Sequence, residues 1–310
     1  MIVGRKEETL NHSSPQSPLV ELEPVVARLL DRHLAAAKEW FPHDYVPWDR
    51  GRSFTDAPWE PADSSLDTAA RTALELNLLT EDNLPYYHLA LRDLFGVDGA
   101  WGEWSRRWTA EEGRHSIAIR DYLLATRAVD PVALERERMD HVSRGYYPRR
   151  IAGPLDGLVY VTLQELATRI AHRNTGALTG DPEAERLLVR VALDENLHYA
   201  FYRDVAAAAI EIDASAMVVA MKRQVLGFTM PGFELRAFRE RAITIAAAGV
   251  YDLRIHHDQV LCPVLLKHWR LCELCGLSGE AEQARDDVLA FLANLDGAHR
   301  RAEEVRSPSC

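Results

Sequence analysis

The segments Glu112-Gly-Arg-His115 and Glu195-Asn-Leu-His198 decide the fold of this chain. In both, a glutamate and a histidine stand three positions apart. On a helix these positions share one face, so both side chains can reach a single metal ion. Taken singly, each motif is weak. In a chain with 12 histidines and 47 acidic residues, chance produces such pairs, and a solvated helix face explains either one.

A further glutamate precedes each pair and turns the two motifs into a repeat. Glu81 lies 31 residues before Glu112, and Glu165 lies 30 residues before Glu195. Each unit predicts a helix with one glutamate, a turn, and an antiparallel helix with Glu-x-x-His. Two such units place four carboxylates and two imidazoles in one core, which is the ligand set of di-iron carboxylate bundles. This set suits iron or manganese and leaves positions open for dioxygen.

Apolar neighbours surround the glutamates of the later unit. Glu165 lies within Val161-Thr-Leu-Gln-Glu-Leu-Ala-Thr-Arg-Ile170, and Glu195 follows Val191-Ala-Leu-Asp. An unpaired ionised carboxylate buried there would cost several kcal/mol, which two divalent cations would offset. The alternative, a set of protonated or ion-paired acids, requires four separate coincidences. The sequence therefore predicts six metal ligands: Glu81, Glu112, His115, Glu165, Glu195 and His198.

Helical patterning dominates the rest of the 310 residues, and strand signals are nearly absent. A helical pattern over 21–40 is followed by an irregular stretch with four prolines between residues 42 and 61. Further helices are predicted near 66–95, 100–127, 131–145, 157–178, 183–211, 214–226, 234–249, 256–275 and 279–305. We expect a flexible N-terminal tail over residues 1–18 and a single all-α domain over residues 19–310.

Composition excludes several classes of function. The net charge of −11 argues against nucleic acid as a partner, because phosphate binding requires a basic surface. No apolar run is long enough for a membrane span, and the polar N-terminus has no hydrophobic core of a signal peptide. Four cysteines do not suggest a disulfide framework. We therefore expect a cytoplasmic protein with reduced thiols.

Three smaller motifs are weaker candidates for a site. Cys272 and Cys275, with His268 before them, resemble half a zinc site, but no second half follows. The run 256–258 (His-His-Asp) lacks metal-binding partners at useful spacing. A tryptophan stripe at helical spacing (Trp101, Trp104 and Trp108) predicts packing in the core or at an interface.

Several segments around the six candidate ligands resemble the acyl-acyl-carrier-protein (acyl-ACP) desaturase family, most closely its actinobacterial branch. The resemblance runs from about Leu22 to Glu304. The segments that carry it are Pro42-His-Asp-Tyr-Val-Pro-Trp48, Leu79-Thr-Glu-Asp-Asn-Leu-Pro-Tyr-Tyr87, Trp108-Thr-Ala-Glu-Glu-Gly-Arg-His115, Gln164-Glu-Leu-Ala-Thr-Arg169, Asp194-Glu-Asn-Leu-His198 and Gly249-Val-Tyr251.

The resemblance implies a ferritin-like helical bundle of about nine to eleven helices with a four-helix di-iron core. It implies that Thr168 lies beside the oxygen-binding face and handles dioxygen and protons. The alternative for Thr168 is a hydroxyl bonded back to a helix carbonyl. Asp194 would orient an imidazole from outside the ligand set, and Trp40 would lie near the electron-entry side or simply pack. Gly113 stands where the family has Asn, which predicts close packing or distortion of that helix.

The implied reaction is the dioxygen-dependent removal of two hydrogens from a saturated acyl chain on acyl carrier protein. It implies two iron ions, a ferredoxin-type electron donor and a homodimer. An acidic carrier protein predicts a local basic patch, with candidates Arg149, Arg150, Lys222, Arg223, Arg236, Arg239 and Arg241. Two alternatives stay open: a di-iron hydroxylase or N-oxygenase of a carrier-bound or free metabolite, and a catalytically silent ferritin-like homologue.

Overall fold

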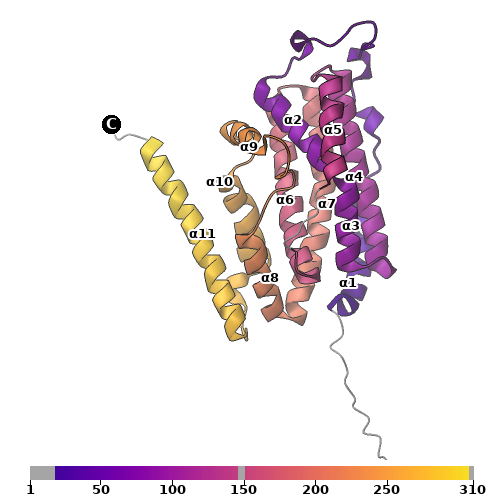
Figure 1. Ribbon diagram of the computed structural model, residues 1–310. Helices are drawn as coiled ribbons and strands as arrows, with labels where there is room; N and C mark the ends of the chain where they lie inside the picture. The colour runs from indigo at the N-terminus through magenta and orange to yellow at the C-terminus, as the bar shows by residue number, and fades with distance from the viewer. Residues whose placement is uncertain (1–17, 146–150, 307–310) are drawn as a thin grey trace, which may run out of the picture.

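Helices build all of the regular structure in the residues that the computed structural model describes, which are 18–145 and 151–306, with side chains to residue 297. Figure 1 shows α1 to α7 as an upright bundle, with α8 to α10 beside it and α11 at its outer edge. The α-helices are α1 Pro18–Ala36, α2 Thr68–Glu81, α3 Leu84–Phe95, α4 Gly99–Ala125, α5 Pro131–Arg144, α6 Pro154–Thr179, α7 Pro182–Ile212, α8 Ala214–Leu226, α9 Phe238–Ala247, α10 Leu253–Ile255 and α11 Gly279–Arg306. The bundle confirms the predicted all-α fold class.

The helices α2, α4, α6 and α7 form the centre of the bundle and carry all six candidate ligands. A tight turn joins α6 to α7: Gly180 adopts the left-handed φ of 62°, and the Asp181 carboxylate accepts a hydrogen bond from the Glu183 backbone N–H at 3.0 Å. The tryptophans of α4 are buried, and Trp104 stacks on Phe201 of α7 with ring centroids 3.6 Å apart. The stripe therefore packs in the core.

The single helix predicted near 66–95 is wrong, because the chain breaks there into α2 and α3. Pro85 lies in the first turn of α3. A proline has no N–H for an i→i−4 bond, and it disfavours helical backbone at the residue before it. The break makes Glu81 the last residue of α2, at a helix end rather than in a helix interior.

The helix predicted near 256–275 is also wrong in its form and its end. After α10 the backbone widens into two π-helical segments, η4 His256–Leu261 and η5 Pro263–His268, and it leaves the helix at Trp269. Pro263 begins the second segment, and because it has no N–H an ordinary i→i−4 bond cannot form at that residue. Cys272 lies in the short 3₁₀ helix η6, Leu271–Glu273, and Cys275 lies beyond it.

Two smaller differences between the predicted and the observed helices lie before α10. The predicted helix 234–249 is confined to α9, and three 3₁₀ turns, η1 Pro42–Asp44, η2 Trp48–Arg50 and η3 Pro61–Asp63, lie in the proline-rich stretch.

Gly113 does not mark the close packing or distortion that its position predicts. The helix α4 is continuous from Gly99 to Ala125. A Cβ atom built on Gly113 would meet only Leu84 Cδ2, at an ordinary contact distance of 3.8 Å.

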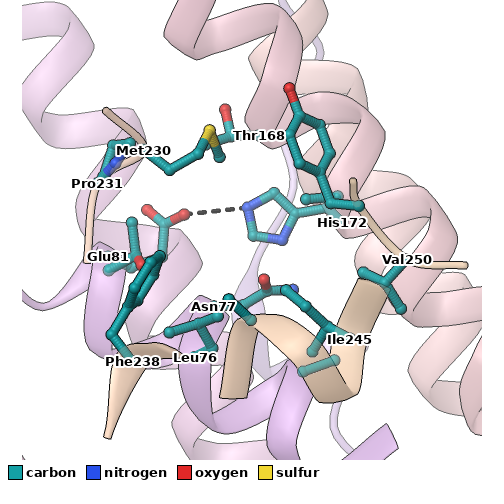
Figure 2. Close-up of a pocket in the computed structure, with 15 residues that line it drawn as sticks. Leu76, Asn77, Glu81, Thr168, His172, Met230, Pro231, Phe238, Ile245 and Val250 are labelled. Atoms are coloured by element: carbon teal, nitrogen blue, oxygen red, sulfur yellow. Dashed lines mark hydrogen bonds and ion pairs between the residues drawn. The ribbon is translucent and has the colours of Figure 1, made fainter. Parts of the chain in front are cut away.

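Two small apolar cavities lie beside α6. The first, of about 120 Å³, is lined by α2, α6, α9 and the segments 230–231 and 250–251 (Figure 2). The second, of about 30 Å³, lies between α3 and α6 and shares Pro231 with the first. Among the described residues, no helix is both long and apolar enough to cross a membrane.

Candidate metal centre

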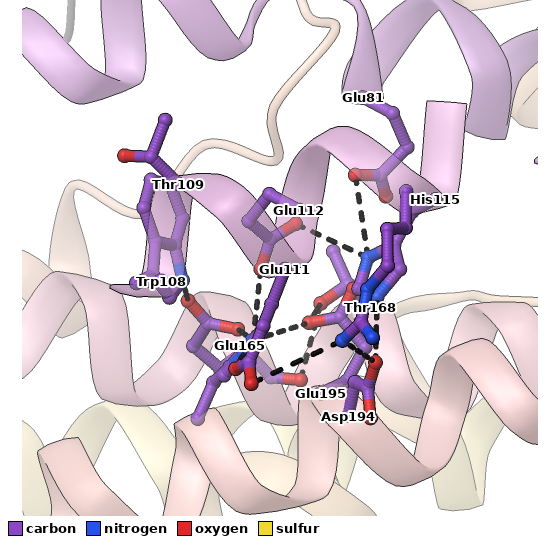
Figure 3. A network of polar contacts seen from close by, with 12 residues as sticks. Glu81, Trp108, Thr109, Glu111, Glu112, His115, Glu165, Thr168, Asp194 and Glu195 are labelled. Atoms are coloured by element: carbon purple, nitrogen blue, oxygen red, sulfur yellow. Dashed lines mark hydrogen bonds and ion pairs between the residues drawn. The ribbon is translucent and has the colours of Figure 1, made fainter. Parts of the chain in front are cut away.

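The structure brings the six predicted ligands together in two overlapping groups. One group contains Glu81 and His115, the other contains Glu165 and His198, and both contain Glu112 and Glu195. Within each group, one candidate ligand atom from every side chain lies within 4.8 Å of the others. All six side chains are buried. Figure 3 shows the carboxylates of Glu81, Glu112, Glu165 and Glu195 gathered near His115. Two groups with two carboxylates in common are the arrangement expected for a pair of metal ions with bridging carboxylates.

Each histidine points its Nδ1 atom at the carboxylates. His115 Nδ1 lies 3.3 Å from both Glu112 Oε2 and Glu195 Oε1. His198 Nδ1 lies 2.8 Å from Glu112 Oε1 and 3.6 Å from Glu165 Oε2. Both Nδ1 atoms are buried and have no hydrogen-bond partner of acceptable geometry among the described residues. The same is true of Glu112 Oε1 and Glu165 Oε2. Orphaned polar atoms that converge on one point are what a metal ion would satisfy.

The protonation of the centre follows from this crowding. Burial raises the pKa of Glu165 well above its usual value. Burial also acts to raise the pKa of Glu195, but the imidazoles of His115 and His198 beside it outweigh burial and lower that pKa well below the usual value. Burial acts to lower the pKa of both histidines, and the surrounding acids raise it instead. The centre therefore needs positive charge, which protons or divalent cations can supply, and cations would displace the protons.

Asp194 lies beside His115, outside the two groups. Its Oδ2 lies 3.5 Å from His115 Nε2, and it accepts hydrogen bonds from Trp40 Nε1 at 2.7 Å and from Arg114 at 3.0 Å. Arg190 pairs with the other carboxylate oxygen. Trp40 is buried, and its ring is nearly parallel to that of His115, with centroids 6.4 Å apart. At 3.5 Å Asp194 faces the His115 ring without a hydrogen bond of acceptable geometry among the described residues, so its orienting role stays a prediction.

Glu111 lies beside His198 as Asp194 lies beside His115, on the other side of the centre. Sequence reasoning missed this residue. Its Oε2 lies 2.9 Å from His198 Nε2 and 2.9 Å from Nε2 of His33, and its Oε1 pairs with Arg107. Burial acts to raise the pKa of Glu111, but the two histidines lower it below its usual value. A comparison of the two units would have found it, because Glu111 precedes Glu112 just as Asp194 precedes Glu195.

His172 is the second residue that sequence reasoning missed. Its Nε2 lies 3.0 Å from Glu81 Oε1, as the dashed line in Figure 2 shows, and 3.6 Å from Glu195 Oε1. It lies on α6 seven residues after Glu165, which is two helical turns along the same face. That spacing was visible in the sequence.

Thr168 faces the centre and also bonds to its own helix. Its hydroxyl lies 3.1 Å from the Gln164 carbonyl oxygen and 3.3 Å from Glu195 Oε2, and its side chain lines the first cavity. Both predicted interpretations of Thr168 thus have a geometric basis. Trp108 closes the opposite side, because its Nε1 donates to Glu165 Oε1 at 2.9 Å and its ring lines the second cavity.

The weaker sequence candidates do not form metal groups in the part of the chain that the structure describes. Cys272 and Cys275 are exposed, and neither joins His268 in a cluster of potential ligands. The run 256–258 also contributes to no such cluster. It holds a different feature, a hydrogen bond between His256 and Tyr251.

Comparisons with known proteins agree with this geometry. The chain matches the fatty acid desaturase family over residues 17–309. It is 46% identical to DesA1 of Mycobacterium tuberculosis, named as an acyl-[acyl-carrier-protein] desaturase, over 90% of this chain and 85% of that protein. It is 30% identical to palmitoyl-[acyl-carrier-protein] 4-desaturase 3 of Ophrys sphegodes, over 96% of this chain and 80% of the relative. The solved structure of DesA2 from Mycobacterium tuberculosis superposes with a TM-score of 0.69 at 28% identity and covers 86% of this chain and 98% of that one.

Proposed function

The chain belongs to the acyl-ACP desaturase family, and we propose from this premise that it inserts a cis double bond into a saturated acyl chain held on acyl carrier protein. The reaction removes two hydrogens from the chain, takes two electrons from an external donor and reduces dioxygen to water. The observation that carries the proposal is a buried set of carboxylates and imidazoles between two apolar cavities. Those cavities are lined by α6 residues from Tyr160 to His172, a length of about 18 Å along the helix axis.

We propose that the centre holds two iron ions. Glu81 and His115 would bind one ion, Glu165 and His198 the other, and Glu112 and Glu195 would be shared. Support comes from the two overlapping groups and from the orphaned Nδ1 atoms that point into them. When bound, the iron pair supplies the oxidant that breaks unactivated C–H bonds, which no amino-acid side chain can do alone.

The residues around the ligands would orient them and manage protons. Asp194 faces Nε2 of His115 at 3.5 Å, and Glu111 pairs with Nε2 of His198 at 2.9 Å, so each imidazole presents Nδ1 to the metal side. The Thr168 hydroxyl lies within hydrogen-bond distance of Glu195 Oε2 and at the cavity wall. It can hold a proton at Oγ1 beside the place where dioxygen would be reduced.

The cavities would hold the acyl chain and exclude water. Apolar side chains such as Leu76, Met230 and Ile245 dominate the first cavity, with Glu81 and Thr168 at its metal side (Figure 2). The second continues past the centre along α3, with Leu91 and Leu94 in its wall. A linear apolar chain threaded through both would present its middle carbons to the metal pair.

An acidic carrier protein needs positive charge near the cavity entrance. Lys222, Arg223 and Arg241 each pair with an acid, namely Asp287, Asp156 and Glu137. Arg149 and Arg150 lie outside the described residues. Arg236 and Arg239 are exposed and have no ion-pair partner among the described residues, and Arg239 lines a groove beside the first cavity. We therefore favour Arg236 and Arg239 for the carrier contact.

The ferredoxin-type donor, the homodimer, the single domain and the cytoplasmic location stay predictions. Light scattering of the purified chain tests the dimer. For the donor, Trp40→Phe should keep iron and slow reduction of the centre.

Aerobic turnover tests the proposed function. Iron-loaded protein, a reduced ferredoxin system and acyl-ACPs of defined chain length should give a product two hydrogens lighter than the substrate. A product with one added oxygen would instead identify a hydroxylase. Full iron loading with no turnover of any acyl-ACP would favour the catalytically silent homologue.

A further inference from the structure

An apolar groove of about 860 Å³ lies on the outer side of the first cavity. Its walls come from the end of α8, from α9 and α10, and from Phe291 and Leu295 of α11. The groove and the first cavity share four residues: Met230, Phe238, Ala242 and Tyr251. The shared residues place the groove directly against the outer side of the cavity, so a chain that extends from Glu81 and Thr168 toward solvent on this side would meet the groove.

The lining also includes Thr229, Arg239, Asp252 and Arg254, and one hydrogen-bonded polar pair stands in its otherwise largely apolar wall. The Tyr251 hydroxyl and Nδ1 of His256 lie 2.8 Å apart. Tyr251 lines both the cavity and the groove, and His256 lines the groove. His256 Nε2 forms no hydrogen bond within the described portion of the chain, and it is not among the fully buried polar atoms. The pair therefore has unused hydrogen-bonding capacity beside the groove.

The surroundings fix the position of the pair. Phe228 stacks on the His256 ring with centroids 4.7 Å apart. The Asp252 carboxylate accepts a hydrogen bond from the Ile255 backbone N–H at 2.7 Å, so α10 begins directly after Tyr251. His256 is the first residue of the π-helical segment η4, and π-helical turns occur frequently at functional sites.

Both members of the pair are neutral near pH 7. Burial and the neighbouring His257 lower the pKa of His256 to about 4. Burial and Asp252 raise the pKa of Tyr251 above its usual value. In one tautomer the tyrosine O–H donates to Nδ1, which leaves Nε2–H as a free donor and the tyrosine oxygen as a free acceptor. In the other tautomer Nδ1–H donates to the tyrosine oxygen, which leaves the tyrosine O–H as a free donor and Nε2 as a free acceptor. Either way the pair offers one donor and one acceptor.

We infer that the Tyr251–His256 pair binds an amide group in the arm that links the acyl chain to its carrier. The inference rests on the proposed function. An amide has one N–H donor and one carbonyl acceptor, which match what the pair offers. In a pantetheine arm, the first amide follows the thioester after two carbons, so it would lie outside the cavity when the acyl chain is inside. A free fatty acid has no such group.

Direct binding tests this inference without turnover. The probes are palmitoyl-pantetheine, which contains the amides, and palmitate, which does not. Iron-loaded protein without an electron donor is titrated with each probe, and Tyr251→Phe and His256→Phe are compared with the unaltered chain. Each substitution should weaken palmitoyl-pantetheine binding about 5- to 10-fold, the effect of one or two hydrogen bonds. Palmitate binding should stay unchanged. Tyr199→Phe is the control, because Tyr199 is buried on α7 and lines neither the cavity nor the groove.

Three outcomes overturn the inference. The unaltered chain does not bind palmitoyl-pantetheine, or both variants bind it as tightly as the unaltered chain does, or the variants lose the same affinity for palmitate as for palmitoyl-pantetheine. Tyr251→Phe removes a single oxygen atom, so circular dichroism should show a native fold. The turnover assay fails or succeeds separately. A chain that binds the arm through this pair without desaturating it contradicts only the proposed function. If the Tyr251→Phe variant desaturates acyl-ACP as well as the unaltered chain and binds palmitoyl-pantetheine with unchanged affinity, only this inference is contradicted.

Discussion

His198 at the candidate metal centre and His256 beside the groove are both buried imidazoles, yet their pKa values shift in opposite directions. Burial alone lowers the pKa of an imidazole. At His256 the effect of burial prevails and the pKa is lowered, because the ring meets a neutral tyrosine and stacks on a phenylalanine. At His198 four glutamates reverse it, and the pKa lies well above the usual value.

The difference separates two kinds of polar site in one helical bundle. The centre collects more negative charge than its own side chains can neutralise, so it is suited to cations. The groove pair carries no net charge and is suited to a neutral hydrogen-bonding group. The two sites border the same cavity, because Glu81 and Tyr251 both line it. We expect substitutions at the centre to change metal content and substitutions at the pair to change ligand affinity.

Glu195→Ala is the most severe test of the ionic side of this contrast. Glu195 belongs to both groups of candidate ligands, so its loss removes one carboxylate from each metal ion. We expect iron content to fall to near background and turnover to fall by at least about 10³-fold. Far-UV circular dichroism should still report a helical bundle. Iron analysis and turnover are the measurements.

The control for Glu195→Ala is Glu185→Ala, an exposed glutamate on the same helix. It should keep full iron and full turnover. Normal iron content in Glu195→Ala would remove Glu195 from the ligand set and leave the two groups without a bridge on that side.

Asp194→Asn and Glu111→Gln test how the ionic site is supported. Each should weaken iron retention about 10- to 100-fold, because each loosens one histidine. Stability should separate them. Asp194→Asn leaves the buried Arg190 without its acid partner, which costs about 3 kcal/mol. Glu111→Gln costs less, because its partner Arg107 has a side chain that is 40% exposed and can turn to water. Chelator competition and urea unfolding measure the two effects.

Asp204→Asn is a control on the same helix as Asp194. Asp204 pairs with Arg32 and Arg203 but lies outside both ligand groups. It should lose little stability and no iron. If Asp194→Asn behaved in the same way, Asp194 would be an ordinary ion pair rather than a support for His115.

The neutral pair should make stability depend on pH in a defined window. The usual pKa of histidine is 6.5, and the folded protein lowers that of His256 to about 4. Above pH 6.5 both the folded and unfolded chains hold it neutral, and its contribution is fully present. As pH falls from 6.5 toward 4, only the unfolded chain takes up the proton, so the free energy of unfolding decreases. At pH 5 the loss should be about 2 kcal/mol. Urea unfolding at pH 7.5 and pH 5 measures it.

His256→Phe isolates this effect, because the other histidines and the metal centre remain in both proteins. The variant should lose about 2 kcal/mol less than the unaltered chain between the two pH values. Equal losses would show that His256 titrates normally and that the pair is not a neutral site.

The contrast between the two sites also explains how much the sequence could predict. The repeated spacing of Glu81, Glu112, Glu165 and Glu195 predicted the four-helix centre, because helical periodicity converts spacing into a shared face. Glu111 and His172 were missed although their spacing was visible, because the Glu-x-x-His spacing identifies the ligands and not the groups that lie beside them.

The Tyr251–His256 pair could not be found from spacing at all. The two residues are five apart, α10 begins between them and the π-helical segment begins at His256, so no regular period brings them together. The break after Glu81 was missed for a related reason. Helical patterning continues across residues 66–95, and the single proline at 85 outweighs it locally.

The smallest effect we predict concerns the frame around the centre. Gly113 stands between Glu112 and Arg114 in a continuous helix, and a Cβ atom there has room. Gly113→Ala should raise the free energy of unfolding by about 1 kcal/mol, from helix propensity alone, with unchanged iron content. Gly176→Ala on α6 is the matched opposite, because its Cβ would lie 3.2 Å from Glu185 Cα and 3.3 Å from Leu188 Cβ on α7. That variant should lose stability. A loss of stability in Gly113→Ala as well would show that α4 requires a glycine beside Glu112 and His115.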